Sequence, residues 1–158
     1  MDKLSSSAKK VQKFLEDLGL KGRVVELPDS TRTAIQAAEA IGCGVEQIVK
    51  SLVFKTSDSN MPILVVASGM NHVNEKMIAA LCGESIEKAD AEFVKEQTGF
   101  SIGGVPPAGH IEKITTFIDE DLLKFDQVWA AAGTPHAVFP LTSDELVNLT
   151  DGKIVPIK

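Results

Sequence analysis

Residues 48–68 read IVKSLVFKTSDSNMPILVVAS, and this stretch decides the fold class. Two runs rich in Val, Ile and Leu, Ile48 to Lys55 and Pro62 to Ser68, have the length of β-strands. The polar segment TSDSN between them is composed of residues that favour turns. The pattern therefore predicts a β-hairpin.

The residues before this hairpin predict two helices and one short strand. Apolar residues at helical spacing predict an amphipathic first helix, namely Val11, Phe14, Leu15 and Leu18. The β-prone run from Arg23 to Leu27 predicts a strand closed by Pro28. Thr33 and Gln36 match a capping box, which predicts a second helix ending at Gly42.

The residues after the hairpin predict three more helices. These begin at the capping residues Asn74, Asp90 and Thr142, and the last has Glu145 in the matching position of a capping box. Further strands are predicted at 115–119, 128–132, 137–141 and 153–157. The total is about seven strands and five helices.

The order of these elements indicates the architecture. Because several strands follow one another near the end of the chain, antiparallel or mixed pairing is favoured over a regularly alternating doubly wound sheet. With 158 residues, the chain has the usual length of one compact domain. We expect a single α+β domain over residues 1–158, with short helices around a mixed sheet.

Composition narrows the possible partners. The chain is 44% hydrophobic and carries 22 acidic against 16 basic side chains, a net charge of −6, with no Lys/Arg block longer than a doublet. Proteins that coat long nucleic acids usually have a basic surface. DNA is therefore not an expected partner, and any contact with RNA should involve a few phosphates and one terminal nucleotide.

Other sequence features predict a cytoplasmic protein without cofactor. No apolar run approaches the ~20 residues needed to span a bilayer, so no membrane association is expected. The start MDKLSSSAKK lacks the apolar stretch of a signal peptide. Cys43 and Cys82 have neither CxxC spacing nor a clustered ligand partner and are expected to be small buried fillers rather than metal ligands. P-loop, GxGxxG, GxSxG and HExxH motifs are all missing.

Lys50 is the first candidate for chemistry. The period of two along a strand places it on the same face as Leu52 and Phe54. An ammonium on an apolar face is costly unless an anion or carbonyls satisfy it, so it is often retained to meet a substrate charge. The alternative that stays open is a lysine whose stem lies along the surface while its head reaches water.

The second candidate is the segment GGVPPAG, residues 103–109. Adjacent glycines allow close backbone approach, and the two prolines stiffen the rest of the segment. Such a loop can direct several N–H groups at one oxygen, as stabilising the oxyanion of ester hydrolysis requires. An ordinary turn between strands would use the same residues.

His136 comes directly after the turn signal GTP and opens the apolar run AVFPL. A neutral imidazole at a strand end can point into a pocket and make one hydrogen bond there. A partly exposed turn histidine is the alternative. His72 and His110 look like ordinary loop residues.

Several spaced motifs together resemble one family. TAIQAAEAIGCGVEQIVKSLVFK, TGFSIGGVPPAGH, FIDEDLL and VWAAAGTPHAVFPLT occur in the order found in the YbaK/ProX family of free-standing aminoacyl-tRNA deacylases, which are related to the editing insertion of bacterial prolyl-tRNA synthetases. The resemblance covers nearly the whole chain. It implies a partly closed mixed sheet with a pocket for the aminoacylated terminal adenosine.

The resemblance also implies roles for individual residues. Lys50 matches the family's functional lysine, and Gly103 and Pro107 match the ends of its G-x-x-x-P loop. His136 resembles the pocket histidine with which some members read the amino-acid side chain, and it is less typical of the cysteine-preferring branch. The implied assignment gives catalysis to Lys50, Gly103 and Gly104 and substrate binding to Val105, Pro106, Pro107 and His136.

The expected function is hydrolysis, without a metal ion or cofactor, of a small wrong amino acid from the acceptor end of a tRNA, most simply the tRNA for proline. Prolyl-tRNA synthetase is a possible partner. Positioning and electrostatics can supply much of the required barrier reduction. Two alternatives remain open: a non-catalytic RNA- or synthetase-binding module, and a nucleotide-sensing regulator that uses the glycine loop.

Overall fold

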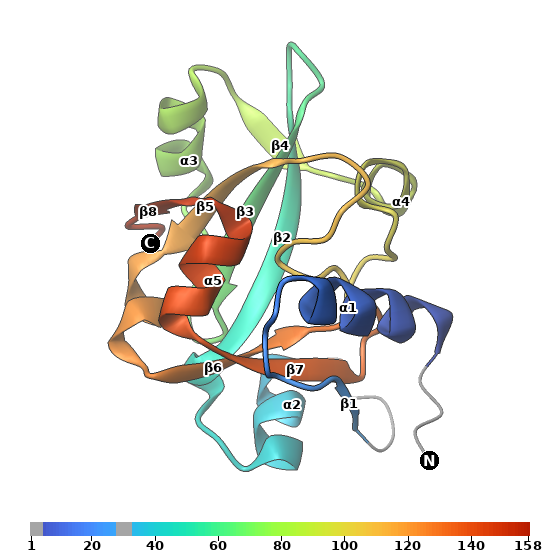
Figure 1. The fold of residues 1–158 in the computed structure, drawn as a ribbon. Helices are drawn as coiled ribbons and strands as arrows, with labels where there is room; N and C mark the ends of the chain where they lie inside the picture. Colours follow the sequence, from blue (N-terminus) through green and yellow to red (C-terminus); the bar gives the residue numbers. More distant parts are fainter. Residues whose placement is uncertain (1–4, 28–32) are drawn as a thin grey trace.

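The computed structural model describes residues 5–27 and 33–158, and Pro28 lies outside them. Within these ranges the strands form one eight-stranded sheet of order β1-β7-β6-β2-β3-β5-β8, with β4 paired to β2 (Figure 1). The strands are β1 (Val25–Glu26), β2 (Ile48–Thr56), β3 (Pro62–Ser68), β4 (Ile86–Lys88), β5 (Thr115–Asp119), β6 (Gln127–Ala131), β7 (Ala137–Thr142) and β8 (Lys153–Val155). None of the described helices is long and apolar enough to cross a lipid bilayer.

The predicted hairpin is the pair β2 and β3, in antiparallel register from Val49 opposite Ser68 to Lys55 opposite Pro62. Three pairings are parallel, namely β2 with β6, β3 with β5 and β5 with β8. The other pairings are antiparallel, which confirms the predicted mixed sheet.

The five predicted helices are confirmed, and their capping residues act as the sequence indicates. They are α1 (Ser6–Asp17), α2 (Ala34–Ile41), α3 (Glu75–Cys82), α4 (Ala91–Thr98) and α5 (Ser143–Thr150). The side chains of Thr33, Asn74, Asp90 and Thr142 each accept a hydrogen bond from a first-turn amide. Such caps satisfy amides that have no partner within the helix.

Some local predictions were wrong. The strand β4 and the two short 3-10 helices η1 (Val45–Gln47) and η2 (Glu120–Lys124) were missed. Cys43 and Cys82 are only partly buried free thiols rather than buried fillers.

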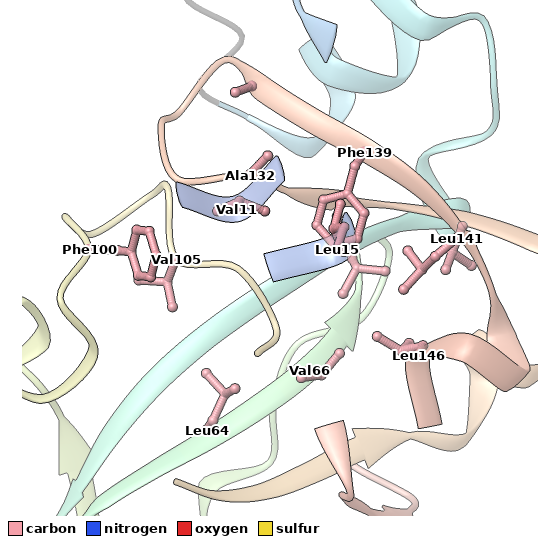
Figure 2. Packing of buried hydrophobic residues seen from close by; sticks show 14 of the residues in the cluster. Val11, Leu15, Leu64, Val66, Phe100, Val105, Ala132, Phe139, Leu141 and Leu146 are labelled. Carbon is pink, nitrogen blue, oxygen red and sulfur yellow. The ribbon is translucent and has the colours of Figure 1, made fainter. Parts of the chain in front are cut away.

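The sheet separates two of the three hydrophobic clusters formed by the described residues. The larger cluster joins α1 and α5 to one face of the sheet and includes Val11, Leu15, Leu64, Val66, Phe139 and Leu146 (Figure 2). The smaller cluster packs Ile78 of α3 against the other face, where Phe54, Ile63, Val65 and Ala67 lie. Leu52 joins this second cluster, and Lys50 lies opposite Ala67 on the same face.

The edge of β2 that faces away from β3 is only partly covered. Its neighbours there are β6, which pairs with Ile48 and Val49, and β4, which pairs with Phe54 to Thr56. Among the described residues, no strand pairs with residues 50–53 on this edge. The Val53 carbonyl accepts from the Ala89 amide at 3.3 Å on this side. The peptide groups of residues two positions apart on a strand point to the same side. Ser51 therefore directs its N–H and C=O into the same gap as Val53.

Candidate active site

A cavity of about 570 Å³ lies over this gap. Its walls come from β2, α2, the segment before α3, the β4–α4 connection, the glycine-rich loop and the ends of β6 and β7. Lys50, Gly103 and Val105 all line it. The two features that the sequence singled out therefore meet in one hollow, although they are about fifty residues apart in the chain.

Lys50 is half-buried and lies where its strand position predicts, on the face with Leu52 and Phe54. Its Nζ donates a hydrogen bond of 2.8 Å to the main-chain carbonyl of Asn71. Burial lowers the pKa of the Lys50 ammonium, because desolvation disfavours the charged form, and the nearby Asp119 carboxylate opposes this shift. The ammonium is thus a partly desolvated donor within the cavity wall.

The glycine-rich loop begins with a tight turn. The Gly104 amide donates to the Ser101 carbonyl at 3.0 Å, and Gly103 between them has a φ of +90°. A positive φ at the third position of a turn strongly favours glycine. The Gly104 amide is therefore used within the turn, and the catalytic role that the resemblance gives Gly104 stays a prediction.

Gly104 instead joins two loops. Its carbonyl accepts from the Gly133 amide at 2.8 Å, and a Cβ at residue 104 would meet the Thr134 backbone at 2.7 Å. Within the described chain, the amides on either side, those of Gly103 and Val105, have no acceptor. Both of these residues line the cavity, whereas Gly104 does not.

Pro106 and Pro107 are buried and lie outside the cavity wall. His110 Nε2 lies 2.7 Å from the Pro106 carbonyl, so the neutral tautomer with a proton on Nε2 donates to it. Burial lowers the pKa of His110, and this hydrogen bond opposes the shift. No sequence signal indicates that His110 holds the loop, since its partner is a main-chain group.

His136 does not line the cavity, although Pro135 and Ala137 on either side of it do. Its side chain is 43% exposed, with Nε2 4.0 Å from a carboxylate oxygen of Glu26 in β1. Its main-chain carbonyl accepts from Leu27. Its suggested role in reading the amino-acid side chain stays a prediction.

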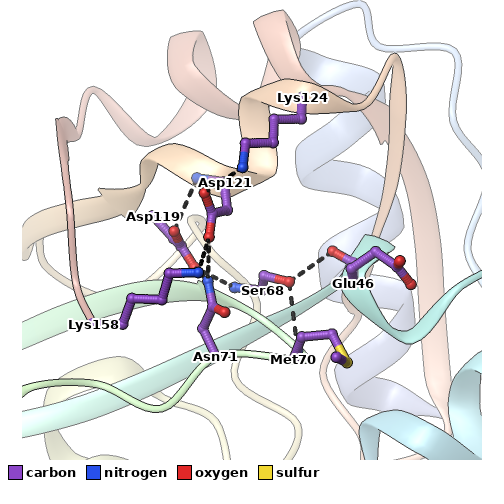
Figure 3. A network of polar contacts seen from close by, with 8 residues as sticks. All are labelled: Glu46, Ser68, Met70, Asn71, Asp119, Asp121, Lys124 and Lys158. Carbon is purple, nitrogen blue, oxygen red and sulfur yellow. Dashed lines mark hydrogen bonds and ion pairs between the residues drawn. The ribbon is translucent and has the colours of Figure 1, made fainter.

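A polar network joins Asn71, which accepts from Lys50 through its main-chain carbonyl, to Asp119 and Asp121 (Figure 3). Asp119 at the end of β5 accepts hydrogen bonds from the Ser68 amide at 3.0 Å and the Asn71 side chain at 2.7 Å. The Asn71 side chain also donates to Asp121 at 2.9 Å, and Asp121 pairs with Lys124 and Lys158. Sequence patterns did not single out this network, because its members lie in three separate segments of the chain, 68–71, 119–124 and 158.

Three further cavity-lining residues are titratable, and no sequence motif singled them out: His72, Glu75 and Lys88. They come from the segment after β3, from α3 and from β4. In the described ranges, no group of three or more His, Cys, Asp or Glu side chains is arranged to hold a metal ion.

Comparison with known proteins gives one consistent family. Residues 28–149 match the family described as the aminoacyl-tRNA editing domain. The uncharacterized protein YwhH of Bacillus subtilis is 32% identical over 148 residues, which are 94% of this chain and 94% of that protein. The proline–tRNA ligase of Brachyspira hyodysenteriae is 40% identical over 78 residues, which are 49% of this chain but only 13% of the ligase.

A solved structure supports the same relationship. It belongs to a protein described as a candidate trans-editing enzyme for prolyl-tRNA synthetase and superposes with a TM-score of 0.93. Its sequence is 47% identical, and the match covers 98% of both chains.

Proposed function

Because the chain belongs to the aminoacyl-tRNA editing domain family, we propose that it is a deacylase that hydrolyses the ester of a mischarged tRNA in trans. The substrate is the tRNA for proline carrying a small wrong amino acid. One observation carries the proposal: Lys50 and the loop residues Gly103 and Val105 line the same cavity.

Lys50 supplies the positive charge of the reaction. Its ammonium neutralises the phosphate of the terminal nucleotide or polarises the ester carbonyl. A partly buried cation acts more strongly than an exposed one, because little water screens it. Water attacks the ester, assisted by the substrate's own ribose hydroxyl or amino group, so no metal ion or protein nucleophile takes part.

The loop amides hold the developing oxyanion. The Gly103 and Val105 amides have no acceptor in the described chain, which leaves them for the ester oxygen. Donors fixed in advance stabilise the transition state without reorganising, and the turn at Gly103 and the Gly104–Gly133 hydrogen bond provide this rigidity.

Cavity size selects the substrate. A volume of about 570 Å³ lies in the range of small-molecule pockets and suits one nucleotide with a small acyl group rather than an RNA stem. Exclusion by size discriminates only ~10- to 200-fold per methylene. The candidates are therefore alanine, serine, threonine or a small unnatural amino acid. His136 next to the cavity rim is proposed to tune this choice.

Two partners are expected for this function. The first is the acceptor end of mischarged tRNA, which the net charge of −6 restricts to a small contact. The second is prolyl-tRNA synthetase, because the chain resembles part of proline–tRNA ligases and a candidate trans-editing enzyme for this synthetase.

The test measures how fast a labelled amino acid is released from each of a panel of mischarged tRNAs. The rate with the protein is compared with the rate in buffer alone. Lys50→Ala should lower kcat/KM by about 100-fold, comparable to losing one transition-state donor. Lys55→Ala is a matched control, because Lys55 lies on the same strand, pairs with Glu87 and does not line the cavity. This control should retain wild-type activity.

Other outcomes would identify the alternatives. Tight binding of mischarged tRNA without ester loss would identify a non-catalytic RNA- or synthetase-binding module. Free nucleotide bound as tightly as aminoacyl-tRNA in calorimetry would identify a nucleotide sensor. Equal activity in Lys50→Ala and Lys55→Ala would remove Lys50 from the mechanism.

A further inference from the structure

The ammonium of Lys50 is held by a main-chain oxygen. The Asn71 carbonyl accepts its hydrogen bond at 2.8 Å and belongs to the segment between β3 and α3. Because this segment has no regular secondary structure, other contacts must fix the position of the carbonyl.

Two buried side chains provide those contacts. Asn71 is 8% exposed and Asp119 is 1% exposed. The Asn71 side-chain amide donates to Asp119 at 2.7 Å and to Asp121 at 2.9 Å (Figure 3). Asp119 in turn accepts from the amides of Ser68 and Asp121. The Asn71 backbone is thereby tied to the end of β5.

The carboxylate of Asp119 is buried away from solvent. No ion pair found in the described chain includes Asp119, and its hydrogen-bond donors are neutral amides. A buried carboxylate without a cationic partner is costly. The negative charge of Asp119 raises the pKa of the Lys50 ammonium and so opposes the lowering caused by desolvation. The other titratable side chains around the cavity are His72, Glu75 and Lys88.

We propose that Asn71 and Asp119 are positioning residues of the deacylase, a role that rests on the function proposed above. Asp119 anchors the Asn71 side chain, so that the Asn71 carbonyl stays within hydrogen-bond distance of Lys50. The carboxylate charge favours the ammonium form of Lys50. Neither residue lines the cavity, so both act through Lys50 rather than on the substrate.

The experiment compares Asn71→Ala and Asp119→Asn with wild type by two readouts. The first is single-turnover deacylation of mischarged tRNA, in which the rate constant should fall ~10- to 100-fold, since small misplacements of a catalytic group have such effects. The enzyme concentration that gives half of the maximal rate should change by less than about threefold. The second is titration of the Lys50 side chain by NMR of its 13Cε resonance, assigned with Lys50→Arg.

The NMR titration separates positioning from general damage. Its midpoint should move to lower pH in both variants, because each weakens an interaction that favours the ammonium. Thr150→Val is the matched control, since it removes another buried polar side-chain bond, from the Thr150 hydroxyl to the Leu146 carbonyl at 2.8 Å. It should lower stability and leave the Lys50 titration unchanged.

An unchanged Lys50 titration in both variants would overturn the inference, as would a rate loss no larger than that of Thr150→Val. If Asp119→Asn does not fold, Asn71→Ala carries the test alone, because it keeps the main-chain carbonyl. Should the wild-type protein leave every mischarged tRNA intact, the deacylase proposal fails. The NMR titration would still show whether the pair controls Lys50.

Discussion

Two lysines on β2 illustrate how one strand gives the same residue type different roles. Lys55 faces Glu87 at 3.5 Å and lies 5.5 Å from the centre of the Phe93 ring, an arrangement that stabilises a peripheral cation. Lys50 lies on the opposite face, lines the cavity and donates a hydrogen bond to the Asn71 main-chain carbonyl. The difference in environment, rather than the residue type, makes Lys50 the functional candidate.

The period of two along β2 was sufficient to predict which face Lys50 occupies. It could not predict the partner, because Asn71 lies 21 positions away and contributes a main-chain oxygen that any residue carries. The same limit applies to Gly104. Its residue type predicts close backbone approach, but the sequence does not reveal that its amide is used within the turn.

Gly104→Ala should destabilise the fold by about 1–3 kcal/mol, the usual cost of overpacking. The added Cβ would lie 2.7–2.8 Å from backbone atoms of Gly133 and Thr134, which cannot turn aside as a side chain can. Urea unfolding measures the change. Gly44→Ala is the control, because its Cβ would meet only the end of the flexible Glu46 side chain. Equal stability of the two variants would contradict the close contact.

At the scale of elements, capping residues were the most reliable signals. A cap is a local interaction within a few residues, so the sequence specifies it directly. β4 contains one apolar residue and was missed, because its only strand partner within residues 5–27 and 33–158 is β2, about thirty residues earlier. The glycine-rich loop was predicted as a loop, whereas its attachment through His110 depends on a contact between a side chain and a main-chain carbonyl.

Acid should loosen this loop. Burial lowers the pKa of His110, so the closed loop binds a proton less readily than the open chain. Stability of the closed loop is therefore complete above the ordinary histidine value of about 6.5 and declines as the pH falls below it. Hydrogen exchange of residues 103–110, corrected for intrinsic rates, should show faster opening at pH 5.5 than at pH 7.5.

The histidine variants identify the titrating group. His110→Gln should abolish the pH dependence of exchange in this segment, and His136→Gln should retain it, because His136 lies against β1 instead. A dependence that survives in His110→Gln would assign it to another group.

At the scale of the whole molecule, the strand order was beyond the reach of the sequence. The hairpin is local, but the parallel pairs of β2 with β6 and of β3 with β5 join residues more than fifty positions apart in the chain. Nothing in the individual segments specifies these partners. The resemblance to the editing family implied a partly closed mixed sheet, and the pairing between β2, β4 and β6 adds the gap over which the cavity lies.

The whole fold should lose stability in acid. Hydrogen bonds lower the pKa values of Glu84, Asp121 and Asp151, with Ser59, Asn71 and Lys113 respectively as the leading donors. A lowered carboxylate pKa stabilises the folded state above the unfolded value of about 4, and this contribution disappears as the pH falls below it. The urea concentration at which half of the protein is unfolded should therefore fall between pH 5 and pH 2.5. Asp121→Asn should flatten this drop, and Asp126→Asn, an exposed carboxylate outside these contacts, should not.

The uncovered stretch of β2 has a consequence for how relatives of this protein diverge. Ser51 contributes peptide groups to the cavity, and no point substitution other than proline removes a peptide N–H. Changes in the cavity-lining side chains of α2 or the β6–β7 connection would therefore alter which acyl group the proposed site accepts, while the Ser51 backbone groups persist. On the proposed function, selectivity could then change in relatives while the backbone scaffold of the site stays the same.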